Sequence, residues 1–157
     1  ESHLYRLVYC FGSFYGFDSH QTQLMLQMLY AGMMPIIGKG NTYWNMIQLD
    51  DAASAVIKMI QDDSQYGGEI FNVCDDEPVM WKTLLNELAK MLGSRSPLHL
   101  PVFLARWLIG KHAVDLWLES MQCKNEKLKK TGWQPQYRTY KEGFQTEIKR
   151  WKERKKG

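Results

Sequence analysis

The hydrophobic residues of the chain fall into two patterns, continuous runs and helical spacings, which alternate along the sequence. Continuous runs rich in aromatic and β-branched residues predict strands at 4–14, 35–37, 44–49, 69–73 and 98–100, the first of them mostly buried. Helical spacing predicts helices at 21–31, after Asp50, at 82–92, 102–109, 114–121 and 126–130, and from Tyr140 onward. The alternation indicates an α/β fold, or an α+β-like fragment of one, and not a helix bundle.

Individual residues predict where the helices begin, end and pack. Asp50, Asn125 and Thr139 are each placed to cap a helix. Gly132 suits the left-handed position after a helix, so that Trp133 can fold back on the preceding turn. The expected packing stripes are Leu24, Met25, Met28 and Leu29, in which the methionines are interpreted as core filling, and Ala52, Ala53, Val56, Ile57 and Ile60.

The composition is that of an ordinary globular protein. With 157 residues, 45% of them hydrophobic and 13% aromatic, the chain can form one compact unit, expected to span residues 1–157. Its three cysteines stand apart without a CxxC pair, which favours a reduced, cytoplasmic protein. No apolar run approaches the roughly 20 residues of a membrane helix, and no signal peptide is visible.

Few residues have a spacing typical of catalysis. The four histidines are scattered, so neither a hydrolase triad nor a histidine metal site is indicated. Caps and turns account for the acidic residues at 50–51 and 75–77, so we expect no metal. The formal net charge is +3, and the basic carboxy-terminal end is interpreted as a solvated helix end, with nucleic acid as its alternative partner.

Five short motifs follow one another along nearly the whole chain. They are Phe14-Tyr15-Gly16, 35–40 (PIIGKG), 45–51 (NMIQLDD), 68–73 (GEIFNV) with Pro78, and 125–135 (NEKLKKTGWQP) with 142–144 (EGF). In this order they resemble the carboxy-terminal half of the NAD-dependent epimerase/dehydratase family, within the extended short-chain dehydrogenase/reductase superfamily.

The resemblance implies that the chain forms the carboxy-terminal strands and the substrate-binding helical lobe of a Rossmann-type protein whose dinucleotide-binding half is missing. The residues implied to border the nicotinamide of NAD or NADP are Phe11, Gly12 and Ser13. The residues implied to contact substrate are Tyr15, Tyr43, Asn45 and Gln48. The implied partners are the amino-terminal half and a small molecule, either a nucleotide sugar or another carbonyl or hydroxyl compound.

The sequence departs from the family's pattern near the expected site. Phe17-Asp18 replaces a Pro-Gly pair, Cys10 replaces a common Arg, and Gln48 replaces a His. A dinucleotide site needs a Gly-rich turn before a helix, and none follows a strand here. Tyr137 and Lys141 have the spacing of an acid/base pair but fall in the family's terminal loop. We therefore expect no catalytic residue in this chain and no cofactor bound by it alone.

Three functions stay open at this point. The chain is the substrate-binding portion of an oxidoreductase, inactive alone, or a non-catalytic binding domain derived from the same family, or a basic nucleic-acid-binding module. A half that normally packs on a parallel sheet would expose an apolar face along 7–14. The isolated chain is therefore expected to self-associate or aggregate.

Overall fold

The computed structural model of the protein describes residues 7–61 and 66–155. Its helices are α1 (His20–Tyr30), α2 (Leu49–Gln61), α3 (Trp81–Leu92), α4 (Val102–Ile109), α5 (Lys111–Leu118), α6 (Glu126–Lys129) and α7 (Tyr140–Arg154). Its strands are β1 (Val8–Phe11), β2 (Ser13–Tyr15), β3 (Ile36–Ile37), β4 (Tyr43–Trp44), β5 (Met46–Gln48), β6 (Ile70–Val73), β7 (Val79–Met80) and β8 (His99–Leu100). The predicted α/β alternation is confirmed.

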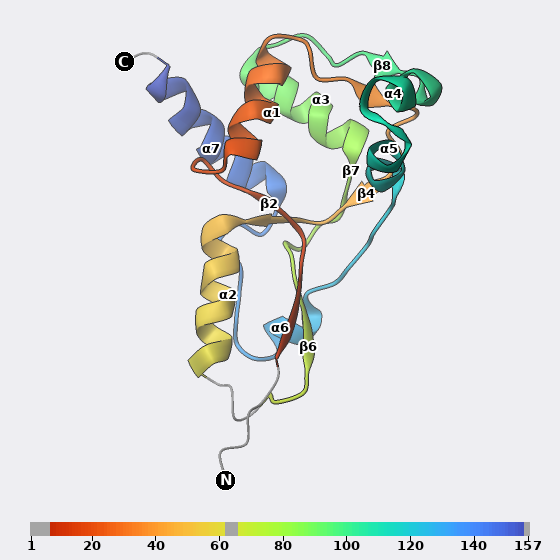
Figure 1. The fold of residues 1–157 in the computed structure, drawn as a ribbon. Helices are drawn as coiled ribbons and strands as arrows, with labels where there is room; N and C mark the ends of the chain where they lie inside the picture. The colour runs from red at the N-terminus through yellow and green to blue at the C-terminus, as the bar shows by residue number, and fades with distance from the viewer. Residues whose placement is uncertain (1–6, 62–65, 156–157) are drawn as a thin grey trace.

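In the described part of the chain the strands form four pairs. β1 runs parallel to β6, with Phe11 opposite Val73, and β2 runs parallel to β5. β3 and β8 are parallel, and β4 and β7 are antiparallel. Only Gly12 separates β1 from β2, so the chain changes its partner strand from β6 to β5 at this residue. Figure 1 shows the path from β1 into β2 crossing the middle of the molecule.

Helices α1, α3 and α7 form a helical layer on one side of β2 and β5 (Figure 1). Its interior holds the larger hydrophobic cluster, in which Leu84 and Phe144 have no exposed surface. Tyr15 enters this cluster from β2, and its ring stacks on Phe144 with 4.2 Å between centroids. Gly143 allows this approach, because a Cβ at that position would overlap the Tyr15 ring.

The opposite side of β2 and β5 carries a strand layer made of β1, β6, α2 and α6 (Figure 1). Its smaller cluster consists of Ile47, Ala52, Ala55, Met59, Phe71, Val73, Leu128 and Trp133. Gly132 has a positive φ of 89°, which turns the chain so that Trp133 packs in the same cluster as Leu128. The predicted fold-back of Trp133 is confirmed.

The packing stripe predicted for α2 is partly wrong. Ala52 is buried, but Ile57 and Ile60 are 57% and 65% exposed. The helix instead packs through Ala55 and Met59. Apolar residues occur on both faces of α2, so the hydrophobic pattern alone could not fix which face turns inward.

The first predicted strand is divided and is not mostly buried. The chain forms β1 and β2 with Gly12 between them, and residues 4–6 lie outside the described part. Val8, Phe11 and Phe14 are all partly exposed, at 46%, 36% and 44%. A run of apolar residues predicts burial only when both faces of the strand are covered, and no described element covers these side chains fully.

The structure corrects one predicted cap and confirms another. α2 begins at Leu49, and Oε1 of Gln48 accepts hydrogen bonds from the amides of Asp50 and Asp51, the latter at 3.2 Å. Gln48 therefore caps this helix in place of Asp50. Thr139 caps α7 as predicted, and its side chain forms a reciprocal capping box with Glu142.

Asn125 does not cap α6 with its side chain. Its amide nitrogen donates to the Cys74 carbonyl and to Oδ1 of Asp76, each at 2.8 Å. Asp76 also accepts from Lys129 at 2.7 Å and from Arg138 at 3.0 Å. Burial opposes ionisation of Asp76, but these hydrogen bonds outweigh it and lower the pKa of the carboxyl. The acidic loop after β6 is thus held to α6 and to the segment before α7.

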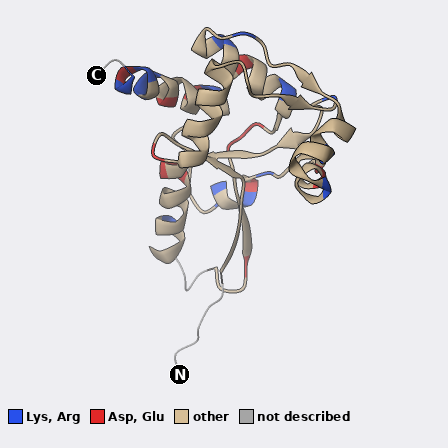
Figure 2. Cartoon of the chain, turned by 45° about the horizontal axis from the view of Figure 1, so that its top comes forward, with Lys and Arg blue, Asp and Glu red and all other residues tan. Residues whose placement is uncertain are grey.

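Basic residues gather at the end of α7, beside the carboxy terminus (Figure 2). Several of them make contacts within the molecule. Nζ of Lys152 donates to the Met91 carbonyl at 2.8 Å, and Nζ of Lys155 lies 4.1 Å from the centroid of the Trp151 ring. Among the described residues, no helix has the length and apolar composition needed to cross a membrane.

Candidate substrate pocket

The change of strand partner at Gly12 creates the candidate site. The Gly12 amide donates to the Val73 carbonyl at 2.9 Å, and the Ser13 amide donates to the Asn45 carbonyl at 2.7 Å. A Cβ on Gly12 would lie 2.7 Å from that same Asn45 oxygen, so the crossing requires glycine. Ligands of open parallel sheets bind beyond the carboxyl ends of the strands, where the strand order changes. Phe11 and Val73 end two parallel strands at such a point.

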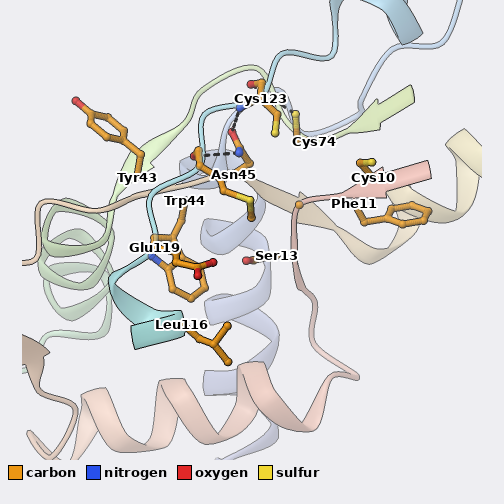
Figure 3. A pocket seen from close by; sticks show the side chains of 12 residues that line it. Cys10, Phe11, Ser13, Tyr43, Trp44, Asn45, Cys74, Leu116, Glu119 and Cys123 are labelled. Carbon is orange, nitrogen blue, oxygen red and sulfur yellow. Dashed lines mark hydrogen bonds between the residues drawn. The ribbon is translucent and has the colours of Figure 1, made fainter. Parts of the chain in front are cut away.

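A pocket of about 340 Å³ lies there. It is lined by Cys10, Phe11, Gly12, Ser13, Tyr43, Trp44, Asn45, Cys74, Leu116, Glu119, Met121 and Cys123. Figure 3 shows Cys10 and Phe11 on one side of the pocket and Trp44, Leu116 and Glu119 on the other. The ring of Tyr43 points away from the other labelled side chains. The pocket thus joins β1 and β4 to the segment that follows α5.

Asn45 holds that segment in place. Its Nδ2 donates to the Met121 carbonyl at 3.1 Å, and its Oδ1 accepts from the Cys123 amide at 3.0 Å. The Met121 amide in turn donates to the Tyr43 carbonyl at 3.1 Å, and Oγ of Ser120 accepts from the Tyr43 amide. Asn45 is 6% exposed. Its amide group is therefore committed to shaping the pocket wall, because both of its ends are already paired.

The pocket contains one carboxylate residue and several thiols. Glu119 supplies the carboxylate. Burial raises the pKa of the Cys74 thiol to about 12, so Cys74 stays protonated and is a poor nucleophile at neutral pH. Within the described residues, no group of three or more His, Cys, Asp or Glu side chains is arranged to hold a metal ion. The residues that line the pocket can therefore enclose and orient a ligand.

The structure brings five of the seven predicted site residues together. Phe11, Gly12, Ser13, Tyr43 and Asn45 all line the pocket. Tyr15 is 1% exposed inside the helical layer, and Gln48 is 3% exposed in the capping network of α2. Nε2 of Gln48 also donates to Oε1 of Glu147 at 3.2 Å. Neither residue lies in this pocket.

Tyr137 and Lys141, which have the sequence spacing of an acid/base pair, are not in the same helix, and they contact different residues. Tyr137 precedes α7, and its amide donates to Oδ2 of Asp51 at 2.9 Å. Lys141 lies on α7 and forms an ion pair with Glu87 at 3.5 Å. The two residues therefore do not share a helix face. This agrees with the sequence analysis, which did not interpret them as an acid/base pair.

Sequence reasoning placed the helices near 102–118, and with them Leu116, at the substrate pocket, but it missed the segment that follows them. Glu119, Met121 and Cys123 lie more than a hundred positions from Phe11 and belong to no motif of known chemistry. The available signal was Asn45, a buried polar residue between two short strands, whose amide had to find partners elsewhere in the chain.

A group of buried acidic side chains lies between the two layers. Asp51 is 3% exposed and accepts the amides of Gln136 and Tyr137. Asp75 is 2% exposed, and burial, reinforced by the charges of neighbouring carboxylates, raises its pKa to about 8. Burial also raises the pKa of the Tyr15 phenol, with Asp75 adding to the effect.

The fold is that of the carboxy-terminal portion of Rossmann-type epimerase/dehydratase proteins. A human epimerase family protein (isoform 2), crystallised with NADPH, matches 91% of this chain with a TM-score of 0.81 and 17% identity. A dTDP-glucose 4,6-dehydratase from Bacillus anthracis, in complex with NAD, matches 96% with a TM-score of 0.71 and 17% identity. A UDP-glucose 4-epimerase from Thermotoga maritima, solved with UDP-glucose, matches 96% with a TM-score of 0.69 and 17% identity.

The chain spans about half the length of each of these proteins, since it covers 48%, 45% and 47% of them. One curated relative, a 3-diazoavenalumate denitrifying reductase from Streptomyces sp, is 26% identical over 92% of this chain and 47% of its own length. No family model matches the sequence. The comparisons therefore establish the fold.

Proposed function

We propose that residues 1–157 form one unit, the substrate-binding portion of an NAD(P)-dependent oxidoreductase of the epimerase/dehydratase type. The observation that carries this proposal is the pocket at the strand switch. It collects Phe11 at the carboxyl end of the parallel strand β1, Gly12 and Ser13 at the switch itself, and Tyr43 and Asn45 from the neighbouring β4–β5 segment. The likeness to a protein solved with NADPH, of which the chain covers 48%, supports the same proposal.

The pocket fits only one end of a dinucleotide. The rim at Phe11, Gly12 and Ser13 is uncharged and aromatic, and suits a nicotinamide ring. None of the described residues that line the pocket is Lys or Arg, and no helix begins there with a Gly-rich turn, as a pyrophosphate requires. The pyrophosphate is therefore left to the amino-terminal half, as is the acid/base pair.

The role of this chain is then to hold the substrate against the cofactor. When bound, NAD(P) supplies hydride transfer. Ser13 from β2 and Glu119 beyond α5 provide polar contacts from opposite sides of the pocket. Asn45 keeps the Glu119 side in position through its two backbone hydrogen bonds. Fixing a substrate in this way lowers the entropic part of the barrier.

Calorimetric titration with NADH and NADPH tests the proposal. We expect no saturable binding by residues 1–157 alone, and binding of one dinucleotide by the complete protein that carries them. Tight binding by residues 1–157 would overturn the assignment of the cofactor to the other half. Absence of binding by the complete protein would favour a non-catalytic binding domain.

A pocket-filling variant extends the test to the substrate. Leu116→Trp narrows the pocket, whereas Leu108→Trp changes an exposed residue of α4 that does not line it. Leu116→Trp should leave the dissociation constant of NAD(P)H in the complete protein within twofold and abolish saturable binding of small carbonyl compounds. Leu108→Trp should change neither. Equal effects of the two variants would contradict the assignment of the pocket.

A further inference from the structure

A second, strongly apolar pocket of about 240 Å³ adjoins the first. It is lined by Ser13, Phe14, Tyr15, Gln21, Thr22, Leu24, Met25, Met28, Met34, Trp44, Met46, Trp81 and Trp117. Ser13 and Trp44 line both pockets, so the two are neighbours. The walls come from α1 and α3 of the helical layer, from strands β2, β4 and β5, and from α5 (Figure 1).

Three tryptophans from separate elements form one wall of this second pocket. The ring centroids of Trp44 and Trp81 are 4.7 Å apart, and Trp117 lies 5.2 Å and 4.9 Å from them. Within the described part of the chain, the buried indole nitrogens of Trp44 and Trp81 have no hydrogen-bond partner. Trp81 as a whole is only 5% exposed. A buried indole N–H usually finds an acceptor, so a ligand oxygen would satisfy an existing deficit once a tryptophan ring turns to present its N–H to the pocket.

Methionines form another part of the lining. Met25, Met28 and Met34 lie on or just after α1, and each is only partly buried. The sequence interpretation of the α1 methionines as core filling therefore holds only in part. Methionine side chains adapt their shape and make favourable sulfur contacts with aromatic rings. A lining that combines methionine and tryptophan side chains is suited to a flat apolar group.

The charges of the two pockets argue against a nucleotide sugar. No Lys, Arg or His lines either pocket among the described residues. The second pocket contains no Asp or Glu either, and the first contains only Glu119. Gln21 and Thr22 from the first turn of α1 line the second pocket, but no cation accompanies them, and the carboxylate of Glu119 in the first pocket would repel a diphosphate. This half of the site therefore favours an uncharged ligand.

We propose that the second pocket binds an aromatic ring of the substrate whose oxygen substituent accepts a hydrogen bond from Trp44 or Trp81. The inference rests on the proposed function and names its substrate class: an uncharged aromatic carbonyl or hydroxyl compound. The size fits, because an apolar cavity of about 150 Å³ holds benzene. A volume of about 240 Å³ therefore accommodates one substituted or bicyclic ring. The reacting carbon then lies in the first pocket, beyond Ser13.

The indole N–H signals of the ¹⁵N-labelled complete protein provide a direct test. The probe is 2-acetonaphthone, a bicyclic ring with a ketone oxygen, and UDP-glucose is the comparison ligand. Signals of Trp44 and Trp81 are assigned with the variants Trp44→Phe and Trp81→Phe. We expect saturable shifts of at least one of these two signals with 2-acetonaphthone and none with UDP-glucose. The reverse result, or no saturable shift with 2-acetonaphthone, would overturn the proposal.

A matched pair of α1 variants localises the binding. Met28→Lys introduces a charge at the pocket wall, and Gln27→Lys introduces the same charge at an exposed neighbour outside this pocket. Met28→Lys should weaken 2-acetonaphthone binding at least tenfold, and Gln27→Lys by less than twofold. Equal weakening would place the probe elsewhere and overturn the assignment.

The outcome is separable from that of the proposed function, because the shifts are measured without a dinucleotide. NADPH binding without 2-acetonaphthone binding would overturn the aromatic pocket and leave the oxidoreductase proposal standing. Binding of 2-acetonaphthone by a complete protein that binds neither NADH nor NADPH would overturn the oxidoreductase proposal, and the pocket would then belong to a binding protein.

Discussion

The helical layer and the strand layer bury their apolar residues to very different extents. In the helical layer, Leu84, Leu88 and Phe144 have no exposed surface. In the strand layer, Val8 and Ile70 are about half exposed, at 46% and 55%, and the outer face of α2 carries exposed isoleucines. The first layer buries the side chains between its helices and leaves Leu24 and Tyr30 on α1 exposed, at 47% and 54%. The second has an apolar face that described residues leave uncovered, where a complete Rossmann-type protein would continue its sheet.

The two layers position different parts of the two pockets. Helices α1 and α3 of the helical layer supply part of the wall of the second pocket, and β2, β4, β5, α5 and the segment after α1 supply the rest. The strand layer carries Phe11 and Gly12 to the rim of the first pocket, but does so on an exposed pair of strands. Under the proposed function, positioning of the rim at Phe11 and Gly12 should therefore depend on the proposed amino-terminal half more than positioning of the second pocket does.

The largest expected effect is the difference in stability loss between a substitution in the core of the helical layer and one on the exposed face of α2. Phe144→Ala removes a fully buried ring that stacks on Tyr15, and should lower the free energy of unfolding by about 3–5 kcal/mol. Ile60→Ala removes a side chain that is 65% exposed and should change it by less than about 0.5 kcal/mol. Urea unfolding followed by circular dichroism measures both. A loss for Ile60→Ala as large as that for Phe144→Ala would mean that the outer face of α2 is packed in the folded protein and not exposed.

A second effect arises where the two layers join. Asp51 on α2 accepts the Gln136 and Tyr137 amides at 2.7 Å and 2.9 Å. Asp51→Ala leaves both amides unpaired and should cost about 2–4 kcal/mol, since each buried unsatisfied group costs roughly 1–3 kcal/mol. Asp51→Asn retains one acceptor oxygen and should cost less. The same unfolding assay ranks the three proteins, and an Asn variant as unstable as the Ala variant would contradict this account.

The sequence predicted elements better than it predicted faces. The helix at 82–92 was recognised because its apolar spacing and the closing Gly93 agree, and Gly93 indeed has a left-handed φ of 74°. The stripe on α2 failed because Ile57 and Ile60 are as apolar as the residues that pack inward. The local sequence pattern shows that a residue is apolar, but whether its side chain is buried depends on which other elements pack against it.

The residues of the candidate site were also predicted only in part from the sequence. The resemblance pointed to Phe11, Ser13 and Asn45, which do meet in one pocket. Gln48 caps α2 and lies outside this pocket, and a side chain that caps its own helix looks, in sequence, like one available to a ligand. The tryptophan wall could not be foreseen, because Trp44, Trp81 and Trp117 belong to three elements with no shared motif. Their meeting depends on tertiary packing alone.

A third effect concerns the pH dependence of stability. The pKa of Asp75 is raised to about 8 in the folded protein, above its ordinary value of 3.8. Between these values the folded state binds more protons than the unfolded state, so this group's contribution to stability is lost as pH rises toward 8. Asp75→Asn should therefore flatten the decline in thermal midpoint between pH 5 and pH 8. A thermal midpoint that depends on pH equally in both proteins would show that Asp75 is not responsible.

The smallest effect on stability, but a direct test of the exposed face, comes from Ile57→Lys combined with Ile60→Lys. Both residues point outward from α2, so the double variant should unfold within about 0.5 kcal/mol of the parent. It should nevertheless weaken self-association of residues 1–157 in sedimentation equilibrium, because charge replaces apolar contact area. Glu153→Lys, which adds the same charge on the exposed side of α7, is the control and should leave association unchanged. If Glu153→Lys reduces association as much as the α2 variant does, general charge repulsion is the cause and the apolar face of the strand layer is not the contact surface.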